Sequence, residues 1–327
     1  MKTTSYSISG TDTAAAGRIR IGVSSCLLGE PVRYDGGHKR DQRLTEELSE
    51  YFEYVPFCPE VAIGLGIPRA TIRLQTSAAG VRALQPGSEE RDVTAELAAY
   101  ARQVAGSAAG ISGYIFKSRS PSCGMERVKV YDHNGLPSGS APGIYAAALR
   151  ESLPLLPMEE EGRLNDPDLR DNFIERVLVY RSWQNMEQSG ITAAALIAFH
   201  SENKFLVMAH SQTAMRELGR LVANLKGRID QTARIYLERL MPALSKPASR
   251  SNQTNVLQHV AGFFSKVLDA GDRRELADAI DLYRREQLPI IVPLTLIRHH
   301  VRRYPQPYLA GQRWLEQRTP ALDTRRR

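Results

Sequence analysis

GYIFKSRSPSCG, residues 113–124, joins a short apolar run to a serine-rich loop that contains a cysteine. An apolar run of this length predicts a buried strand, and Ser, Pro and Gly predict the loop after it. Residues 21–29 and 54–60 repeat this arrangement, with Cys26 and Cys58 just beyond their own apolar runs. Ligands of an open α/β sheet bind at the carboxyl ends of its strands. The three loops, with Cys123 in the third, therefore predict one site that contains every cysteine of the chain.

Strand and helix signals alternate through the first half of the chain. Short β-branched and aromatic runs predict strands, and helical periodicity predicts the segments between them. Such alternation indicates an α/β domain with a mostly parallel sheet covered on both faces. Strands are expected at 19–25, 54–57, 113–117 and 127–131, a hairpin at 71–75 and 81–85, and helices at 45–51, 92–108 and 144–151.

The second half shows helical periodicity throughout and predicts an all-α domain. LPLLP at residues 153–157 ends the strand–helix alternation, and MEEEG at 158–162 is interpreted as a linker. Helices are expected at 168–186, 192–200, 212–240, 254–268, 273–287 and 294–303. The expected organisation is a disordered tail at 1–18, an α/β domain at 19–157 and a helical domain at 158–327.

The 327 residues include 43 basic and 36 acidic side chains, for a net charge of +7. Most of the excess lies in the second half, which ends in three arginines at 325–327. A basic half can contact nucleic acid, but a solvated helical surface is favoured because no groove-reading motif is present. No apolar run reaches about 18 residues, so no membrane span is expected. An odd number of cysteines argues against a disulfide framework and indicates the reducing cytoplasm.

Three cysteines can bind a metal in more than one way. A structural zinc site needs four ligands, often in C-x-x-C pairs, but these cysteines are unpaired, and His38 and His133 are the only histidines of the first half. A [4Fe–4S] cluster takes four thiolates, one per iron, so three cysteines would leave one iron open to a soft sulfur ligand. The alternative is three small buried hydrophobes. Turn residues beside the cysteines, namely Gly29, Pro59 and Gly124, favour the metal site.

Four motifs give the first half a family resemblance. They are SCLLG at 25–29 followed by VRYDG at 32–36, CPE at 58–60 followed by IPR at 67–69, DVT at 92–94, and K-x-x-S-P-S-C-G at 117–124. In this order and spacing they resemble the motifs of the thiouracil desulfurase family, over about residues 19–150. The resemblance implies a Rossmann-like domain that holds a [4Fe–4S] cluster on Cys26, Cys58 and Cys123.

The resemblance also implies a reaction and roles for nearby side chains. The open iron takes the sulfur of a thiolated pyrimidine, water supplies the oxygen in a non-redox reaction, and sulfide is released. Glu60 would be the acid/base group and Ser120 the hydroxyl that positions or activates the substrate, with Ser118 and Ser122 as alternatives. For Glu60, the structural alternative is an ion pair with an arginine at 33 or 69. Arg33 would contact the substrate or form a bracket with the aspartate at 35.

The second half resembles the YbgA-type domain, which brings no activity with it. The matching stretches are 171–177, 199–200, 204–211, 218–222, 255–259 and 288–300. Five histidines here allow a metal site, although no Glu-x-x-His pair supports one, and core or surface positions are favoured. The five are His200, His210, His259, His299 and His300. A basic face for RNA is the other hypothesis, from Arg176, Lys204, Arg220, Arg298 and Arg302.

The residues and the resemblance together predict a cytoplasmic iron–sulfur desulfurase that acts on a small thiolated pyrimidine. The helical domain would shape substrate access or form a homodimer. A second hypothesis is a nucleic-acid-binding module that acts on or senses thiolated bases in RNA. A third is a metal-free enzyme with one nucleophilic cysteine, which leaves the other two cysteines without a role.

Overall fold

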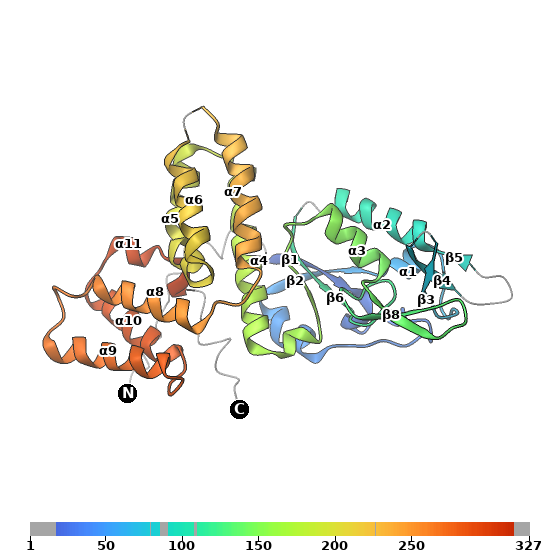
Figure 1. Ribbon diagram of the computed structural model, residues 1–327, viewed down its shortest axis with the longest axis horizontal. Helices are drawn as coiled ribbons and strands as arrows, with labels where there is room; N and C mark the ends of the chain where they lie inside the picture. The colour runs from blue at the N-terminus through green and yellow to red at the C-terminus, as the bar shows by residue number, and fades with distance from the viewer. Residues whose placement is uncertain (1–17, 79, 86–90, 108–109, 226, 317–327) are drawn as a thin grey trace, which may run out of the picture. The chain divides into compact units, whose positions relative to one another are not determined.

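The computed structural model describes residues 18–78, 80–85, 91–107, 110–225 and 227–316. The chain separates into two units, residues 1–166 and 167–327, and each is described by itself (Figure 1). The division falls nine residues beyond the expected boundary after residue 157. Of the expected tail at 1–18, only Arg18 belongs to the described residues.

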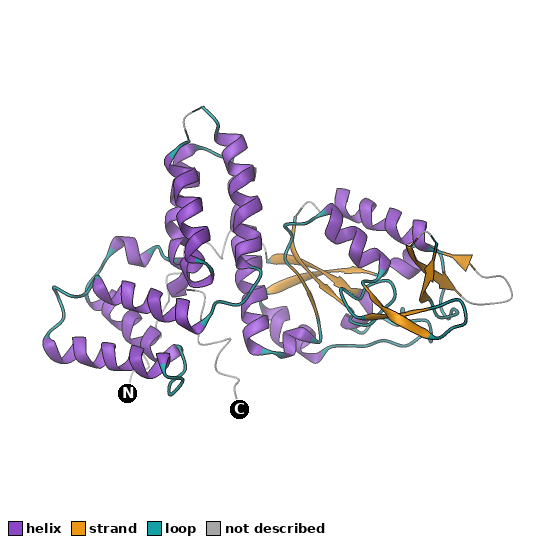
Figure 2. Cartoon of the chain, viewed as in Figure 1, coloured by secondary structure: helices purple, strands orange, loops and turns teal. Residues whose placement is uncertain are grey.

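A parallel sheet of four strands forms the centre of the first unit (Figure 2). Its order is β2 (Phe52–Phe57), β1 (Ile19–Ser24), β6 (Ile111–Phe116) and β9 (Met158–Glu160). This confirms the predicted α/β class. The linker predicted at 158–162 is wrong, because β9 pairs with β6 and Met158 and Glu159 are buried. Three consecutive glutamates carry no strand pattern, so only pairing with β6 reveals this strand.

Both faces of the parallel sheet are covered, as the alternation of strands and helices predicts. On one face Tyr145, from α3 (Ile144–Ser152), packs against Tyr114 and Phe116 of β6 at ring distances of 6.2 Å. The ring of Tyr114 lies so close to Gly22 that a Cβ atom there would be 2.4 Å from Cδ2. On the other face Tyr54 donates a hydrogen bond of 3.0 Å to the carbonyl of Leu44.

The segment around Leu44 differs from the expected helix at 45–51. It consists of η2 (Arg43–Glu47), with π-type hydrogen bonding, and η3 (Leu48–Glu50), with 3₁₀ bonding. The helix expected at 92–108 is α2 (Thr94–Ser107), which packs against α3. The carboxylate of Asp92 accepts the backbone N–H of Thr94 and so satisfies one free donor at the start of α2.

A second sheet accounts for the remaining strands and was not predicted as a separate layer. Its order is β5 (Arg91–Asp92), β4 (Gly80–Gln85), β3 (Arg73–Ser77), β7 (Val128–Tyr131) and β8 (Pro137–Ala141). The predicted hairpin is confirmed as the antiparallel pair β3–β4, but β7 joins this hairpin and not the parallel sheet. The apolar side chains of this second sheet form a common core with Leu97 of α2. The sequence PSGSA of β8 carries no strand signal.

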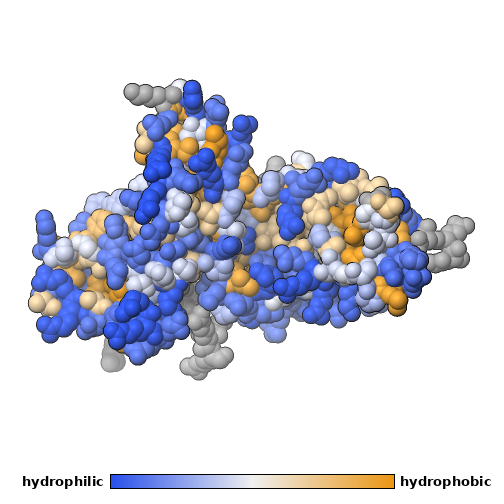
Figure 3. All heavy atoms as spheres, in the orientation of Figure 1, coloured by the Kyte–Doolittle hydropathy of each residue, from blue (hydrophilic) through white to orange (hydrophobic). Residues whose placement is uncertain are grey.

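The second unit is helical, as predicted. Its helices are α4 (Pro167–Gln188), α5 (Ala193–His210), α6 (Gln212–Ala223), α7 (Ile229–Leu244), α8 (Arg250–Gly262), α9 (Ala270–Arg284), α10 (Ile291–Arg303), α11 (Pro307–Ala310) and α12 (Arg313–Glu316). The single helix expected at 212–240 is two helices. Figure 3 shows a mostly hydrophilic face over this unit. Among its described helices and those of the first unit, none has the length and apolar character needed to cross a membrane.

Three of the five histidines of the helical unit serve its packing, whereas His299 is exposed. His200 contacts the buried hydroxyl of Tyr236 at 3.0 Å, and the ring of His210 lies between Glu175 and the carbonyl of Lys246. His259 packs against Phe205. Within the described residues no three His, Cys, Asp or Glu side chains are arranged to hold a metal ion.

The basic face predicted for this unit is only partly formed. The side chain of Arg176 is buried, and that of Arg298 donates to the carbonyl of Leu315 at 2.7 Å. Two of the five basic residues therefore support the helical core. The loss of surface cations weakens this face as a nucleic-acid contact.

Candidate active site

The three cysteines line one cavity of about 310 Å³. Cys26 lies in η1 (Ser25–Leu28), which follows β1, and Cys58 lies between β2 and α1 (Pro59–Ala62). Cys123 lies in the loop after β6. The three strands are neighbours in the parallel sheet, so their carboxyl ends bring the loops to one edge.

The loop that carries Cys123 is held by the first turn of α3. The backbone N–H groups of Ile144 and Ala146 donate to the carbonyls of Pro121 and Ser122 at 3.1 and 3.0 Å. This contact needs a glycine before the helix, because a Cβ atom on Gly143 would lie 2.6 Å from the Ser122 carbonyl oxygen. The cysteine is thus positioned by a regular helix as well as by its loop.

All three thiols are free, and burial opposes their ionisation. Loss of water around Cys26, with the nearby charge of Cys58, raises its pKa to about 11. Burial also raises the pKa of Cys58 and, to a greater extent, that of the fully buried Cys123. These thiols become good ligands only when a positive centre among them favours the thiolate.

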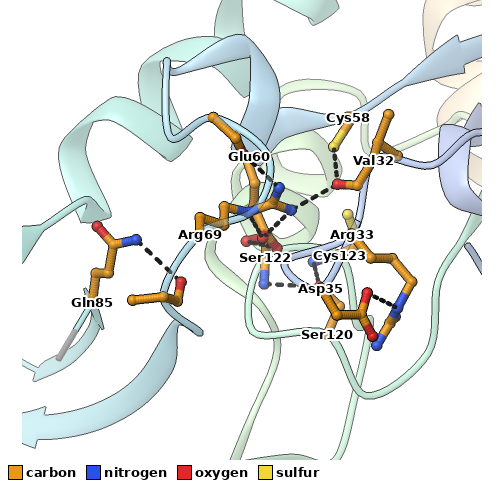
Figure 4. Close-up of polar contacts among 12 residues, drawn as sticks. Val32, Arg33, Asp35, Cys58, Glu60, Arg69, Gln85, Ser120, Ser122 and Cys123 are labelled. Atoms are coloured by element: carbon orange, nitrogen blue, oxygen red, sulfur yellow. Dashed lines mark hydrogen bonds and ion pairs between the residues drawn. The ribbon is translucent and has the colours of Figure 1, made fainter. Parts of the chain in front are cut away.

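Glu60 lies in the first turn of α1 and points into the cavity, where two neighbours hold its carboxylate (Figure 4). Arg69 donates to Oε2 through Nε at 3.0 Å and through Nη2 at 2.8 Å. Ser122 donates its hydroxyl to Oε1 at 2.9 Å. The ion pair considered for this carboxylate therefore exists, and its partner is Arg69 and not Arg33.

The three serines of the loop have different hydrogen-bond partners. The hydroxyl of Ser118 accepts a hydrogen bond from Lys117 and donates one of 2.8 Å to Glu161. The hydroxyl of Ser122 donates to Glu60. Ser120 accepts the backbone N–H groups of residues 122 and 123 at 3.2 and 3.1 Å. In the described part of the chain, Ser120 is the one serine of the three whose own proton has no acceptor.

Lys117 and Glu161 form an ion pair at the same edge of the sheet. Lys117 follows β6, and Glu161 follows β9 one residue after its end. Glu161 also accepts the backbone N–H of Ser118 at 2.7 Å. The sequence interpretation placed Glu161 in a linker and missed it. The only signal in the sequence was the apolar segment LPLLP just before β9. To use it, β9 would have had to be recognised as a parallel strand that ends beside Glu161.

Arg33 lines the cavity and also forms part of a loop bracket. Its Nε atom lies 3.8 Å from the carboxylate of Asp35, and its guanidinium lies 5.3 Å from the ring of Tyr34. The Gly37 backbone N–H and the charge of Arg33 lower the pKa of Asp35. Both roles considered for Arg33 are thus compatible with its position, at the wall of the cavity and in its own loop.

Comparison with known proteins follows the division into two units. Residues 21–161 match the family model described as 2-thiouracil desulfurase, and residues 204–318 match the model of a protein of unknown function, DUF1722. The chain is 36% identical over 148 residues to the uncharacterized protein YbgA of Escherichia coli K12, which covers 45% of this chain and 88% of YbgA. Residues 21–161 belong to the 2-thiouracil desulfurase family. The predicted resemblances of both halves are confirmed, and the first half is of the desulfurase class of enzymes.

Two further relatives of this desulfurase-family chain match a similar share of its length. The uncharacterized protein YbbK of Bacillus subtilis 168 is 31% identical over 145 residues, which is 40% of this chain and 89% of YbbK. A solved structure described as the [4Fe-4S]-dependent thiouracil desulfidase TudS is 32% identical, covers 45% of this chain and 94% of its own, and has a TM-score of 0.36. Every residue that lines the cavity lies within the match to the desulfurase model.

Proposed function

We propose that the first unit catalyses the non-redox desulfuration of a thiouracil-like pyrimidine, with a [4Fe–4S] cluster held by Cys26, Cys58 and Cys123. One observation carries the proposal: three free thiols, a fixed carboxylate and a hydroxyl with an unused proton line the same cavity. Its volume of about 310 Å³ is at the lower end of the range for small-molecule sites.

The residues fit the cluster in number, type and charge. Thiols of a [4Fe–4S] cluster bind different irons, so they need not converge on one point as the ligands of a single ion do. A cluster with three thiolates is anionic, and Arg33, Lys117 and Arg119 bring positive charge to the cavity wall. When bound by Cys26, Cys58 and Cys123, the cluster would supply one iron without a protein ligand as a soft Lewis acid for a sulfur atom.

The chain's own residues handle the water and its protons. A C=S bond and a water molecule become a C=O bond and hydrogen sulfide, so both protons of the water end on the released sulfur and no electrons are exchanged. Glu60 accepts a proton from the attacking water at Oε1, because Oε2 already receives two hydrogen bonds from Arg69. Ser120 donates a hydrogen bond through its free O–H to an acceptor atom of the ring and holds the carbon toward the water.

Anaerobic reconstitution of the full chain tests this function. The protein is loaded with iron and sulfide, and uracil and sulfide are measured after addition of 2-thiouracil or 4-thiouracil. We expect about four irons per chain, a brown protein and release of one sulfide for each uracil. A chain that carries the cluster and converts no thiolated pyrimidine would contradict the proposal.

Ser120→Ala and Ser118→Ala distinguish the serine assignments. We expect Ser120→Ala to lower kcat by about 10²-fold, because it removes a hydrogen-bond donor aimed at the reacting ring. Ser118→Ala removes a hydroxyl that is already occupied by Lys117 and Glu161, so its loss of kcat should be much smaller. Iron content is measured for both variants, since Ser120 also supports the backbone at Cys123. A larger loss in Ser118→Ala would reverse the assignment.

A second candidate substrate is a thiolated base within RNA. A groove of about 1140 Å³ adjoins the cavity and shares Ser118 and Arg119 with it. Arg73, Arg127 and Lys129 also line the groove, and such cations suit phosphates next to a base in the cavity. Thiolated RNA in the turnover assay distinguishes this substrate from the free base. Homodimer formation and the cytoplasmic location remain predictions.

A further inference from the structure

Arg69 is the most completely engaged charged side chain at the cavity. Its side chain is only 3% exposed, and it donates four hydrogen bonds of 2.8 to 3.0 Å. Besides its two bonds to Glu60, it donates through Nη1 to the carbonyl of Gly66 and through Nη2 to that of Val32, each at 2.9 Å. One guanidinium therefore connects the loop after Cys26, the helix after Cys58 and the turn at residues 64–66.

The bonds to Glu60 restrict the orientation of its carboxylate. Oε2 receives both N–H groups of Arg69, and Oε1 receives the hydroxyl of the fully buried Ser122. The plane of the carboxylate is fixed because both of its oxygens are held. Oε1 accepts one bond from protein, that of Ser122, and has acceptor capacity for a second, and Glu60 lines the cavity (Figure 4).

We propose that Arg69 is a positioning residue for desulfuration, which presents Oε1 of Glu60 to the attacking water. This rests on the proposed function, in which Glu60 accepts the proton of that water. Arg69 lines the cavity but spends its donors on Glu60 and on two backbone carbonyls. Its effect on the reaction therefore passes through Glu60 and not through direct contact with the substrate.

A lysine cannot replace this arrangement. The guanidinium is planar and reaches three separate acceptors in fixed directions, whereas an ammonium is a single point charge on a flexible stem. In Arg69→Lys the charge beside Glu60 is kept, but the carboxylate and the Val32 carbonyl cannot both be held as before. A displacement of about 1 Å in a reacting group can cost on the order of 10²-fold in rate.

The test compares kcat, KM and iron content of the iron-loaded full chain with those of Arg69→Lys and Arg69→Ala. We expect kcat to fall by about tenfold to 10²-fold in both variants, with KM and iron content close to those of the wild type. Millimolar guanidinium should restore part of kcat in Arg69→Ala, which a purely structural role would not allow. Arg43→Lys is the matched control, because Arg43 also donates to a backbone carbonyl, that of Leu164, but lies outside the cavity.

The Glu60→Gln background shows whether Arg69 acts through the carboxylate. There the added change Arg69→Lys should cost little, because the group that it positions has already lost its function. An equal loss in both backgrounds, unchanged kcat in Arg69→Lys, or loss of iron from Arg69→Lys would each overturn the inference. If the iron-loaded wild type does not desulfurate any thiolated pyrimidine, the proposed function itself fails and the inference fails with it. Turnover by the wild type with unchanged kcat in Arg69→Lys overturns the inference alone.

Discussion

Cys123→Ser should lose its iron and its desulfurase activity together after anaerobic reconstitution. Cys123 is only 5% exposed and lies beside the other two thiols in a cavity that they share. Serine has nearly the same shape, but its hydroxyl is a hard and weakly acidic ligand, whereas iron–sulfur clusters require thiolates. We expect far fewer than four irons per chain and turnover at background. Iron analysis and the visible absorption spectrum measure the effect, and Cys26→Ser and Cys58→Ser should behave alike.

Tyr145→Phe is the control for this variant. It removes only a hydroxyl from the buried ring cluster beside the parallel sheet, where Tyr145 contacts the hydroxyl of Tyr114 at 3.2 Å. Its iron content should equal that of the wild type. If Cys123→Ser also kept its iron and activity, the cysteines would be small buried hydrophobes, which is the alternative that their sequence leaves open.

Glu60→Gln should keep the cluster and lose most of the turnover. Glutamine has the shape of glutamate, and its oxygen can accept from Arg69 while its amide N–H donates to the hydroxyl oxygen of Ser122, but it cannot take a proton from water. Loss of a general base lowers kcat by roughly 10²- to 10⁴-fold. The measurement is kcat for 2-thiouracil at equal iron content.

Glu159→Gln provides a matched control for Glu60→Gln. Glu159 is also a buried carboxylate paired with an arginine, since Arg163 lies 2.7 Å from its Oε1, but it does not line the cavity. It should retain wild-type kcat. Should Glu60→Gln be as active as Glu159→Gln, the role of Glu60 would be its hydrogen bonds to Arg69 and Ser122 and not proton transfer.

Much of the fold was predictable because its strands follow simple patterns. The apolar runs of β1, β2 and β6 read as buried strands, and helical periodicity identified the second unit. The prediction of strands was wrong where a segment becomes a strand only through pairing with a neighbouring strand. β9 is polar in sequence and becomes a strand only by pairing with β6. The second sheet similarly depends on β7 joining the distant hairpin β3–β4, a contact that no local pattern indicates.

The sequence by itself predicted that the three cysteines meet at one site, and it determined the fold class of the first domain and its family. The physical reason is that parallel strands end at a common edge, so residues just beyond several strands are brought near one another. Only the tertiary structure decided how the polar side chains around them are paired. Glu60 is held by Arg69 and by Ser122, which is 62 residues away, and Ser118 donates to Glu161. A hydrogen bond forms only when its donor and acceptor lie within a few tenths of an ångström of the favourable distance. The spacing of residues in the sequence does not encode such distances between atoms of loops that are far apart along the chain.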